Sequence, residues 1–198
     1  MSSLFSLRSV FSALAIACAL VLAGCGSDKT EFRGSDISGS KLGADLAMVD
    51  DTGQTRTLAD YKGKVVVAFF GFTQCPDVCP TSMSQLAHVV ELLESDADKV
   101  QVLMISVDPE RDTPEILSSY VKAFNPNFVG LTGSPEQLAA TAKSFRTFYA
   151  KVPGSGPDDY TMDHGASFYV LDKTGEARVL LRPDTPAEDI VHDIRELL

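Results

Sequence analysis

The fold of this chain is decided by the stretch Lys64-Val-Val-Val-Ala-Phe-Phe70, followed directly by Gly71-Phe-Thr-Gln-Cys75-Pro-Asp-Val-Cys79-Pro80. Residues 64–70 are a continuous apolar run of strand length, which is typical of a central strand that is covered on both faces. Pro80 favours the first turn of a helix, because the backbone N–H groups of that turn have no intrahelical acceptor and the N–H that proline lacks is not needed there. The two cysteines are therefore expected at the carboxyl end of a buried strand, where open α/β sheets place their functional sites.

Strands and helices alternate along the chain after this stretch. Apolar runs predict further strands over residues 100–107 and 127–131, and a hairpin over residues 167–171 and 177–182. Four helices are predicted to begin near a proline, namely Pro80, Pro114, Pro135 and Pro186. Two of these starts, Ser134–Gln137 and Thr185–Glu188, have the spacing of a capping box. This order predicts one α/β domain over residues 41–198, with a thioredoxin-like fold in which helices flank a central mixed sheet.

The first 24 residues have the pattern of a lipoprotein signal peptide. Arg8 precedes an apolar run over residues 10–23, which is too short to span a bilayer comfortably. The run ends in Leu22-Ala23-Gly24-Cys25, which resembles the bacterial lipobox, so we expect cleavage before Cys25 and a lipid on its sulfur. An ordinary signal peptide with an incidental cysteine is the alternative. Residues 25–40, rich in glycine, serine and charge, are predicted to form a flexible tether.

The lipid anchor predicts an extracytoplasmic location on the periplasmic side, with the cytoplasmic membrane favoured. The net charge of −10 over 198 residues argues against a nucleic-acid binder, which needs basic surface to neutralise phosphates. With 44% hydrophobic residues the chain is too apolar to be disordered. Cys18 lies in the signal peptide and Cys25 carries the lipid, so only Cys75 and Cys79 remain as thiols.

Three interpretations of the Cys75–Cys79 pair are open. A structural disulfide is permitted in an oxidising compartment, but it would close a loop too short to constrain the unfolded chain much. A redox-active dithiol is the second. A metal site is the third, since paired soft thiolates suit Cu(I) above all, with Zn(II) as an option. The helix N-terminus beside Cys79 is expected to favour its thiolate form.

A nearby histidine would favour the metal site, and His164 is the best placed of the three in the chain. It precedes the strand predicted at residues 167–171, in the loop that faces the cysteine pair in thioredoxin-like folds and usually carries a cis-proline. Asp163 either orients the imidazole or faces solvent. His88 is expected at the surface of the first helix and His192 exposed on the last one, while Met83 is expected in the core.

Three motifs occur together: Cys75-Pro-Asp-Val-Cys79-Pro80, Asp108-Pro-Glu-Arg-Asp-Thr-Pro114 and Asp163-His164. With them, residues 31–198 resemble the Sco family (Sco/SenC), the copper-binding proteins of cytochrome c oxidase assembly, in the bacterial lipoprotein form. The resemblance implies one copper ion, Cu(I) or Cu(II), bound by Cys75, Cys79 and His164. It also implies delivery of copper to the CuA site of cytochrome c oxidase subunit II, or reduction of the thiols of that site, and allows another periplasmic protein as copper donor.

The alternative function is that of a membrane-tethered thiol–disulfide oxidoreductase, in which Cys75 and Cys79 form the redox pair without a metal. A peroxidase of the peroxiredoxin type would need Thr-x-x-Cys, and Thr73-Gln-Cys75 has the wrong spacing. The motif at residues 108–114 is expected to be structural. Asp112 or Thr113 would cap the next helix, and Arg111 would pair locally.

Overall fold

The structure, a computed structural model, describes residues 31–156 and 159–198. The predicted signal peptide over residues 1–24 and the predicted lipidation at Cys25 lie outside the described residues. From Phe32 to Leu198 the chain forms one unit with its own core. Within the described ranges, no helix combines the length and the apolar character that crossing a membrane requires.

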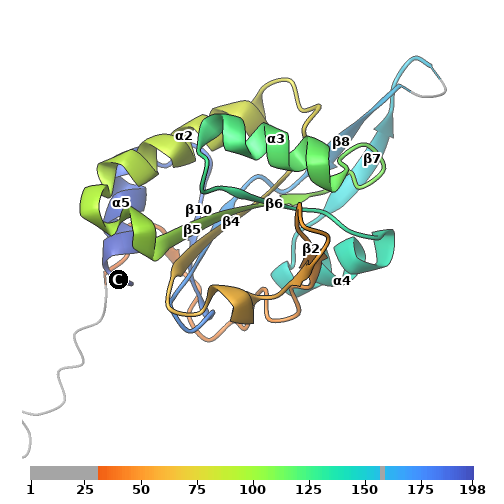
Figure 1. Cartoon of the computed structure of the whole chain (residues 1–198). Helices are drawn as coiled ribbons and strands as arrows, with labels where there is room; N and C mark the ends of the chain where they lie inside the picture. Colours follow the sequence, from red (N-terminus) through yellow and green to blue (C-terminus); the bar gives the residue numbers. More distant parts are fainter. Residues whose placement is uncertain (1–30, 157–158) are drawn as a thin grey trace, which may run out of the picture. The chain divides into compact units, whose positions relative to one another are not determined.

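A six-stranded mixed sheet forms the centre of the domain (Figure 1). Its strand order is β1-β10-β9-β4-β5-β6, with β4 parallel to β5 and antiparallel to β9. The strands are β1 (Ser35–Asp36), β4 (Val65–Gly71), β5 (Val100–Ser106), β6 (Val129–Leu131), β9 (Phe168–Leu171) and β10 (Ala177–Leu181). All seven residues of β4 are buried, as expected for a strand covered on both faces. The predicted mixed sheet is confirmed.

Helices cover both faces of this sheet (Figure 1). One face carries α2 (Val78–Leu92), α3 (Pro114–Phe124) and α5 (Ala187–Arg195), and the other carries α4 (Pro135–Phe145) and the hairpin of β2 (Met48–Val49) and β3 (Thr55–Arg56). Two 3-10 helices, η2 (Leu58–Tyr61) and η3 (Glu94–Lys99), precede β4 and β5.

The helix starts follow the predicted capping pattern with one exception. The side chains of Thr113 and Ser134 cap α3 and α4, each directly before a proline at the first helical position. The capping box predicted at residues 185–188 is wrong. Pro186 is the N-cap residue of α5, and the Thr185 hydroxyl instead accepts a hydrogen bond from the Arg182 backbone.

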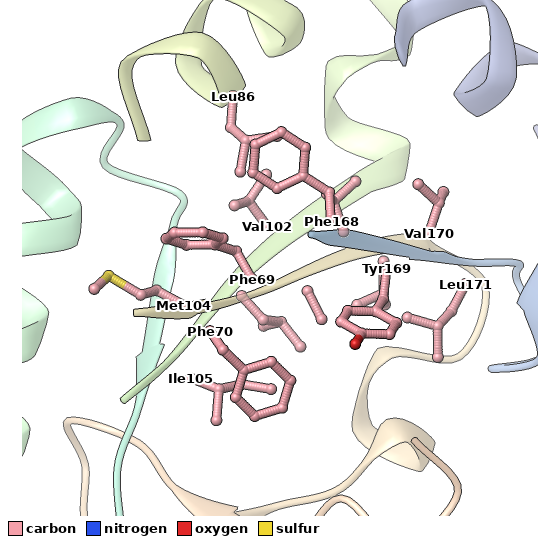
Figure 2. Packing of buried hydrophobic residues seen from close by; sticks show 14 of the residues in the cluster. Phe69, Phe70, Leu86, Val102, Met104, Ile105, Phe168, Tyr169, Val170 and Leu171 are labelled. Atoms are coloured by element: carbon pink, nitrogen blue, oxygen red, sulfur yellow. The ribbon is translucent and has the colours of Figure 1, made fainter. Parts of the chain in front are cut away.

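Adjacent phenylalanines of β4 anchor the two halves of the core. Figure 2 shows Phe69 and Phe70 on opposite sides of the strand, as the alternation of side chains in a strand requires. The Phe69 ring packs edge-on against Phe168, with centroids 5.6 Å apart, and the Phe70 ring packs in the same way against Phe145 of α4 at 5.3 Å. The strand that leads to the cysteines is therefore held from both sides.

The domain boundary predicted between residues 40 and 41 is wrong. Ser35–Asp36 form β1, which pairs antiparallel with β10 at the edge of the sheet. The backbone N–H groups of Arg33 and Gly34 donate to the buried carboxylate of Asp193 on α5, at 2.7 and 2.8 Å. Both residues of β1 are exposed, so this edge strand has the polar composition that predicts a tether.

A second hairpin, absent from the predicted elements, follows α4. Strands β7 (Tyr149–Pro153) and β8 (Tyr160–His164) pair with each other and, among the described residues, form a separate two-stranded sheet. Of the five residues of β7, four are exposed, so the hairpin buries little of the apolar surface by which a strand is recognised. His164 consequently lies at the end of a strand and not in a loop.

Asp50, at the turn between β2 and β3, gives the stability of the domain a defined acid dependence. Burial alone would raise its pKa, but hydrogen bonds from Thr52, Arg56 and Gln54 outweigh burial and lower the pKa to about 2. A carboxylate with a depressed pKa stabilises the fold above its unfolded-state pKa, and this contribution is lost as the pH falls through the folded-state pKa. Asp50→Asn should therefore cost about 2 kcal/mol at neutral pH, with the difference from wild type vanishing between about pH 4 and pH 2.

Urea unfolding at a series of pH values measures this difference. The exposed Asp45→Asn is the control variant and should show no comparable change. A difference between Asp50→Asn and wild type that stays constant down to pH 2 would contradict the role assigned to this carboxylate.

Candidate metal centre

Cys75 and Cys79 lie at the carboxyl end of β4, where the strand passes into α2. Helix α2 begins at Val78, so Cys79 sits in its first turn, and both cysteines are free thiols. Cys79 is fully buried, whereas Cys75 is half-buried on the loop before the helix. The predicted position of the pair at this strand-to-helix edge is confirmed.

The structure brings the three predicted ligands to one place, with Cys79 in contact with both Cys75 and His164. The Cys79 Sγ lies 3.8 Å from the His164 Nε2, although the two residues are 85 positions apart. The Cys75 Sγ accepts a hydrogen bond from the Cys79 backbone N–H at 3.4 Å, so it points toward the helix N-terminus. Across residues 31–156 and 159–198, no three His, Cys, Asp or Glu side chains already stand in a metal-holding arrangement.

The imidazole of His164 is oriented so that Nε2 faces the thiol. Its Nδ1 lies 3.0 Å from the Gly165 carbonyl oxygen, which can only accept, so Nδ1 carries the proton and Nε2 keeps its lone pair. The rings of Phe69 and Phe72 pack edge-on against the imidazole, with centroids 6.4 and 5.9 Å away. Asp163 is exposed, which agrees with the alternative that it faces solvent. The Gly165 carbonyl oxygen is the group that orients the imidazole.

The expectation that the helix N-terminus favours a Cys79 thiolate is wrong for the metal-free protein. Burial raises the pKa of the Cys79 thiol far above its ordinary value, and a hydrogen bond from the Phe72 backbone offsets only part of this. The Cys79 side chain is fully buried, so desolvation outweighs any stabilisation of the thiolate by the helix N-terminus. A metal that binds here must displace the Cys79 proton.

Gly71, the last residue of β4, leaves room for the buried sulfur. A Cβ at this position would lie 3.0 Å from the Cys79 Sγ and 2.8 Å from the Phe69 ring. Any larger residue would push against the thiol or against the ring that packs on His164. The glycine that ends the strand is therefore part of the site.

The buried carboxylate of Asp112 holds the loop that carries Cys75 against the end of β5. It accepts hydrogen bonds from the Thr73 hydroxyl and the Ser106 hydroxyl, both at 2.6 Å, and from the Thr73 backbone N–H. Burial raises the pKa of Asp112. Of the two residues expected to cap α3, Thr113 does so, while Asp112 instead joins the end of β5 to the loop that carries Cys75.

The remaining residues singled out from the sequence lie outside the site. His88 is exposed on α2, as expected, while His192 on α5 is half-exposed, with its Nδ1 3.0 Å from the Asp193 carboxylate. Met83 is buried in the core, as expected. Tyr160 was not singled out, although it precedes His164 by four residues in an alternating strand and so shares its face.

The chain matches proteins of one family along most of its length. The model of the family described as SCO1/SenC matches residues 35–198. An SCO2-like protein of Rickettsia felis is 38% identical over 137 residues, which cover 69% of this chain and 67% of that protein. The mitochondrial protein SCO2 homolog of Mus musculus is 40% identical over 153 residues, which cover 76% of this chain and 60% of that protein. The match thus spans about two thirds or less of the length of these two relatives.

Solved structures of the same family share the fold. The copper-bound ScoI of Bradyrhizobium japonicum is 39% identical, with a TM-score of 0.71, and the match covers 77% of this chain and 97% of that one. The apo Sco1 protein of Thermus thermophilus is also 39% identical, with a TM-score of 0.77 and coverages of 86% and 99%.

A third structure, of BsSco, concerns a disulfide switch in a protein described as a member of the Sco family of cytochrome c oxidase assembly proteins. It is 25% identical, with a TM-score of 0.64 and coverages of 84% and 98%. The thioredoxin-like fold predicted from the sequence is confirmed by these likenesses. By the family model and by its relatives, this chain belongs to the SCO1/SenC family.

Proposed function

We propose that this domain binds one copper ion through Cys75, Cys79 and His164 as cargo for the assembly of cytochrome c oxidase. The recipient we propose is the CuA site of subunit II, to which the domain delivers copper or whose cysteines it keeps reduced. The observation that carries the proposal is the 3.8 Å approach of the His164 Nε2 to the free thiol of Cys79, while Nδ1 faces the Gly165 carbonyl oxygen.

The donor set suits copper. Two thiolates and one neutral imidazole match the preference of Cu(I) for soft ligands, and the imidazole also suits Cu(II). Cys79 and His164 are held by the fold, and the Cys79 backbone N–H holds the Cys75 Sγ beside the first turn of the helix. Because Cys75 is half-buried on a loop, it is also the residue that a partner reaches first.

The relatives support this proposal. Copper-bound structures exist for family members from Bradyrhizobium japonicum and Arabidopsis thaliana, which are 39% and 32% identical to this chain. We propose further that a lipid on Cys25 anchors the protein on the periplasmic side of the cytoplasmic membrane, where it would meet the oxidase and receive copper from another periplasmic protein.

Titration of the reduced protein with Cu(I) and Cu(II) tests the ligand set. The wild type should bind one equivalent of each ion. His164→Ala should lose Cu(II) binding and lower the Cu(I) affinity by about 100-fold or more, because the loss of an outer-shell partner alone costs 10–100-fold. His192→Ala and the exposed His88→Ala are matched controls and should titrate like wild type.

Two results would overturn the proposal. One is an unchanged affinity in His164→Ala, and the other is wild-type protein that binds less than one equivalent of copper. Transfer to the apo CuA domain of subunit II, followed by the absorbance of the assembled CuA centre, tests the partner. If the copper-loaded protein assembles no CuA centre and the reduced protein does not reduce an oxidised CuA domain, the proposed partner is rejected.

Thiol–disulfide exchange without a metal is the second candidate function, because both cysteines are free and one of them is accessible. In this reaction the Cys75 thiolate attacks a partner disulfide and forms a mixed disulfide, releasing one partner thiolate. Cys79, after losing its proton to solvent, then forms the Cys75–Cys79 disulfide and releases the second partner thiolate, so that two electrons pass to the partner. Exchange that proceeds at the wild-type rate in His164→Ala, alongside failure to bind copper, would favour this function.

A further inference from the structure

The hairpin that carries His164 contacts the loop between β5 and α3 through side chains near its turn, where Tyr160 pairs with Pro153. Strands β7 and β8 pair with each other and with no strand of the central sheet in the part of the chain that the structure describes. The position of His164 relative to the cysteines therefore depends on the side-chain contacts between the hairpin and the rest of the domain.

Arg111, on the loop between β5 and α3, contacts both parts of the site. Its Nη1 donates to the Gln74 side-chain oxygen and to the Tyr160 carbonyl oxygen, both at 3.0 Å. Gln74 directly precedes Cys75, and Tyr160 begins the strand that ends at His164. One nitrogen thus links the cysteine loop to the histidine strand.

The ring of Tyr160 completes this link. The Arg111 guanidinium carbon lies 3.7 Å from its centroid, and the ammonium of Lys151 lies 3.8 Å from the same centroid. The buried carboxylate of Asp108 accepts from the Tyr160 hydroxyl at 2.9 Å and also from the Arg111 Nε. Lys151 in turn pairs with Glu110 at 2.8 Å. Arg111, Tyr160 and Asp108 form a closed set of contacts, which we call the hairpin clamp.

We propose that Arg111 is a positioning residue, which through the hairpin clamp sets where His164 stands relative to Cys75 and Cys79. This inference rests on the proposed function and deepens it. Tyr160 and His164 are four residues apart in β8, so their side chains leave the same face of the hairpin. A shift of Tyr160 is therefore passed along a short strand to the imidazole. Lysine cannot replace arginine here, because it lacks the planar fork that binds several acceptors while stacking on a ring.

The test compares Arg111→Lys with Arg178→Lys. Arg178 is also partly buried and paired with an aspartate, Asp172, but lies on β10, away from the cysteines. Arg111→Lys should lower the Cu(II) affinity about tenfold, as expected when a group that orients a ligand is lost, and should weaken the thiolate-to-copper charge-transfer band. Arg178→Lys should change neither. Tyr160→Phe, which loses only the hydroxyl contact with Asp108, should lower the Cu(II) affinity by less. It provides the test if Arg111→Lys does not fold.

Two further measurements separate positioning from a general structural role. In the His164→Ala background, Arg111→Lys should have no additional effect on Cu(I) affinity, because Arg111 acts through the imidazole. In the reduced, metal-free protein, Arg111→Lys should shift the His164 ring resonances and speed amide exchange in β7 and β8, with amides of β4 and β5 unchanged.

Each possible failure has its own meaning. Equal copper affinities of Arg111→Lys and wild type, with unchanged His164 resonances, would overturn the inference. An equal loss caused by Arg111→Lys with and without His164 would also overturn it. If His164→Ala binds copper like wild type, the proposed function fails, and the His164 resonances and hairpin exchange of metal-free Arg111→Lys still decide whether the clamp positions the hairpin.

Discussion

Cys79→Ser is expected to abolish tight copper binding while the domain stays folded. The Cys79 sulfur is fully buried and lies 3.8 Å from the His164 Nε2, so this substitution removes the sulfur that is already placed beside the imidazole. A serine hydroxyl is a poor ligand for Cu(I), which prefers soft sulfur. We expect the Cu(I) affinity to fall by more than about 100-fold, beyond the 10–100-fold that an outer-shell loss costs. Competition against a Cu(I) chelator of known affinity measures it.

Cys75→Ser is the natural comparison. It should also weaken copper binding, and it should leave stability closer to that of wild type, because Cys75 is half-buried while Cys79 is enclosed. Thermal unfolding of the metal-free variants checks the fold of each. Tight Cu(I) binding by folded Cys79→Ser protein would show that this sulfur is no ligand.

Phe69→Ala and Phe70→Ala should be similarly destabilising but should differ in their effect on copper. Each ring is fully buried, and truncating a buried phenylalanine costs about 3–5 kcal/mol. Phe69 packs against His164 and lies beneath Gly71, whereas Phe70 packs against Phe145 and Tyr169 on the other face of β4. Only Phe69→Ala should therefore weaken copper binding, by about tenfold or more, as expected for a group that orients a ligand.

Urea unfolding gives the two free energies, and copper titration under conditions where both variants are folded gives the affinities. Because the residues are neighbours in one strand, each variant controls for the other. Equal copper affinities in the two variants would mean that the Phe69 ring does not help to hold the imidazole.

The core and the strand-to-helix position of the cysteines were predictable because strong local signals mark them. The apolar run over residues 64–70 is typical of a buried central strand, and the prolines at the starts of α3 and α4 coincide with caps that the structure shows. The proximity of His164 to Cys79 was predictable only from the topology of thioredoxin-like folds, because no local sequence pattern indicates it.

Other features depend on tertiary contacts that the local sequence does not encode. The edge strand β1 is polar because it is exposed, and β7 and β8 bury little, so neither shows a strand pattern. The Cys79 thiol is protonated because the folded protein encloses it, a fact that its place beside a helix N-terminus conceals. The contacts of Arg111 join residues that are 37 and 49 positions away. Spacing along the chain carries no signal for such pairs.

The edge position of β1 determines how the domain bears mechanical load. If the chain is pulled ahead of Phe32, as by the anchor proposed at Cys25, the force acts first on the hydrogen bonds to the Asp193 carboxylate and on the pairing of β1 with β10. Strands β10 and β9 lie between β1 and β4, so a force that peels β1 away does not act directly on the strand that leads to the cysteines. A membrane anchor at this end can hold the protein at a surface under tension without a direct pull on the proposed copper ligands.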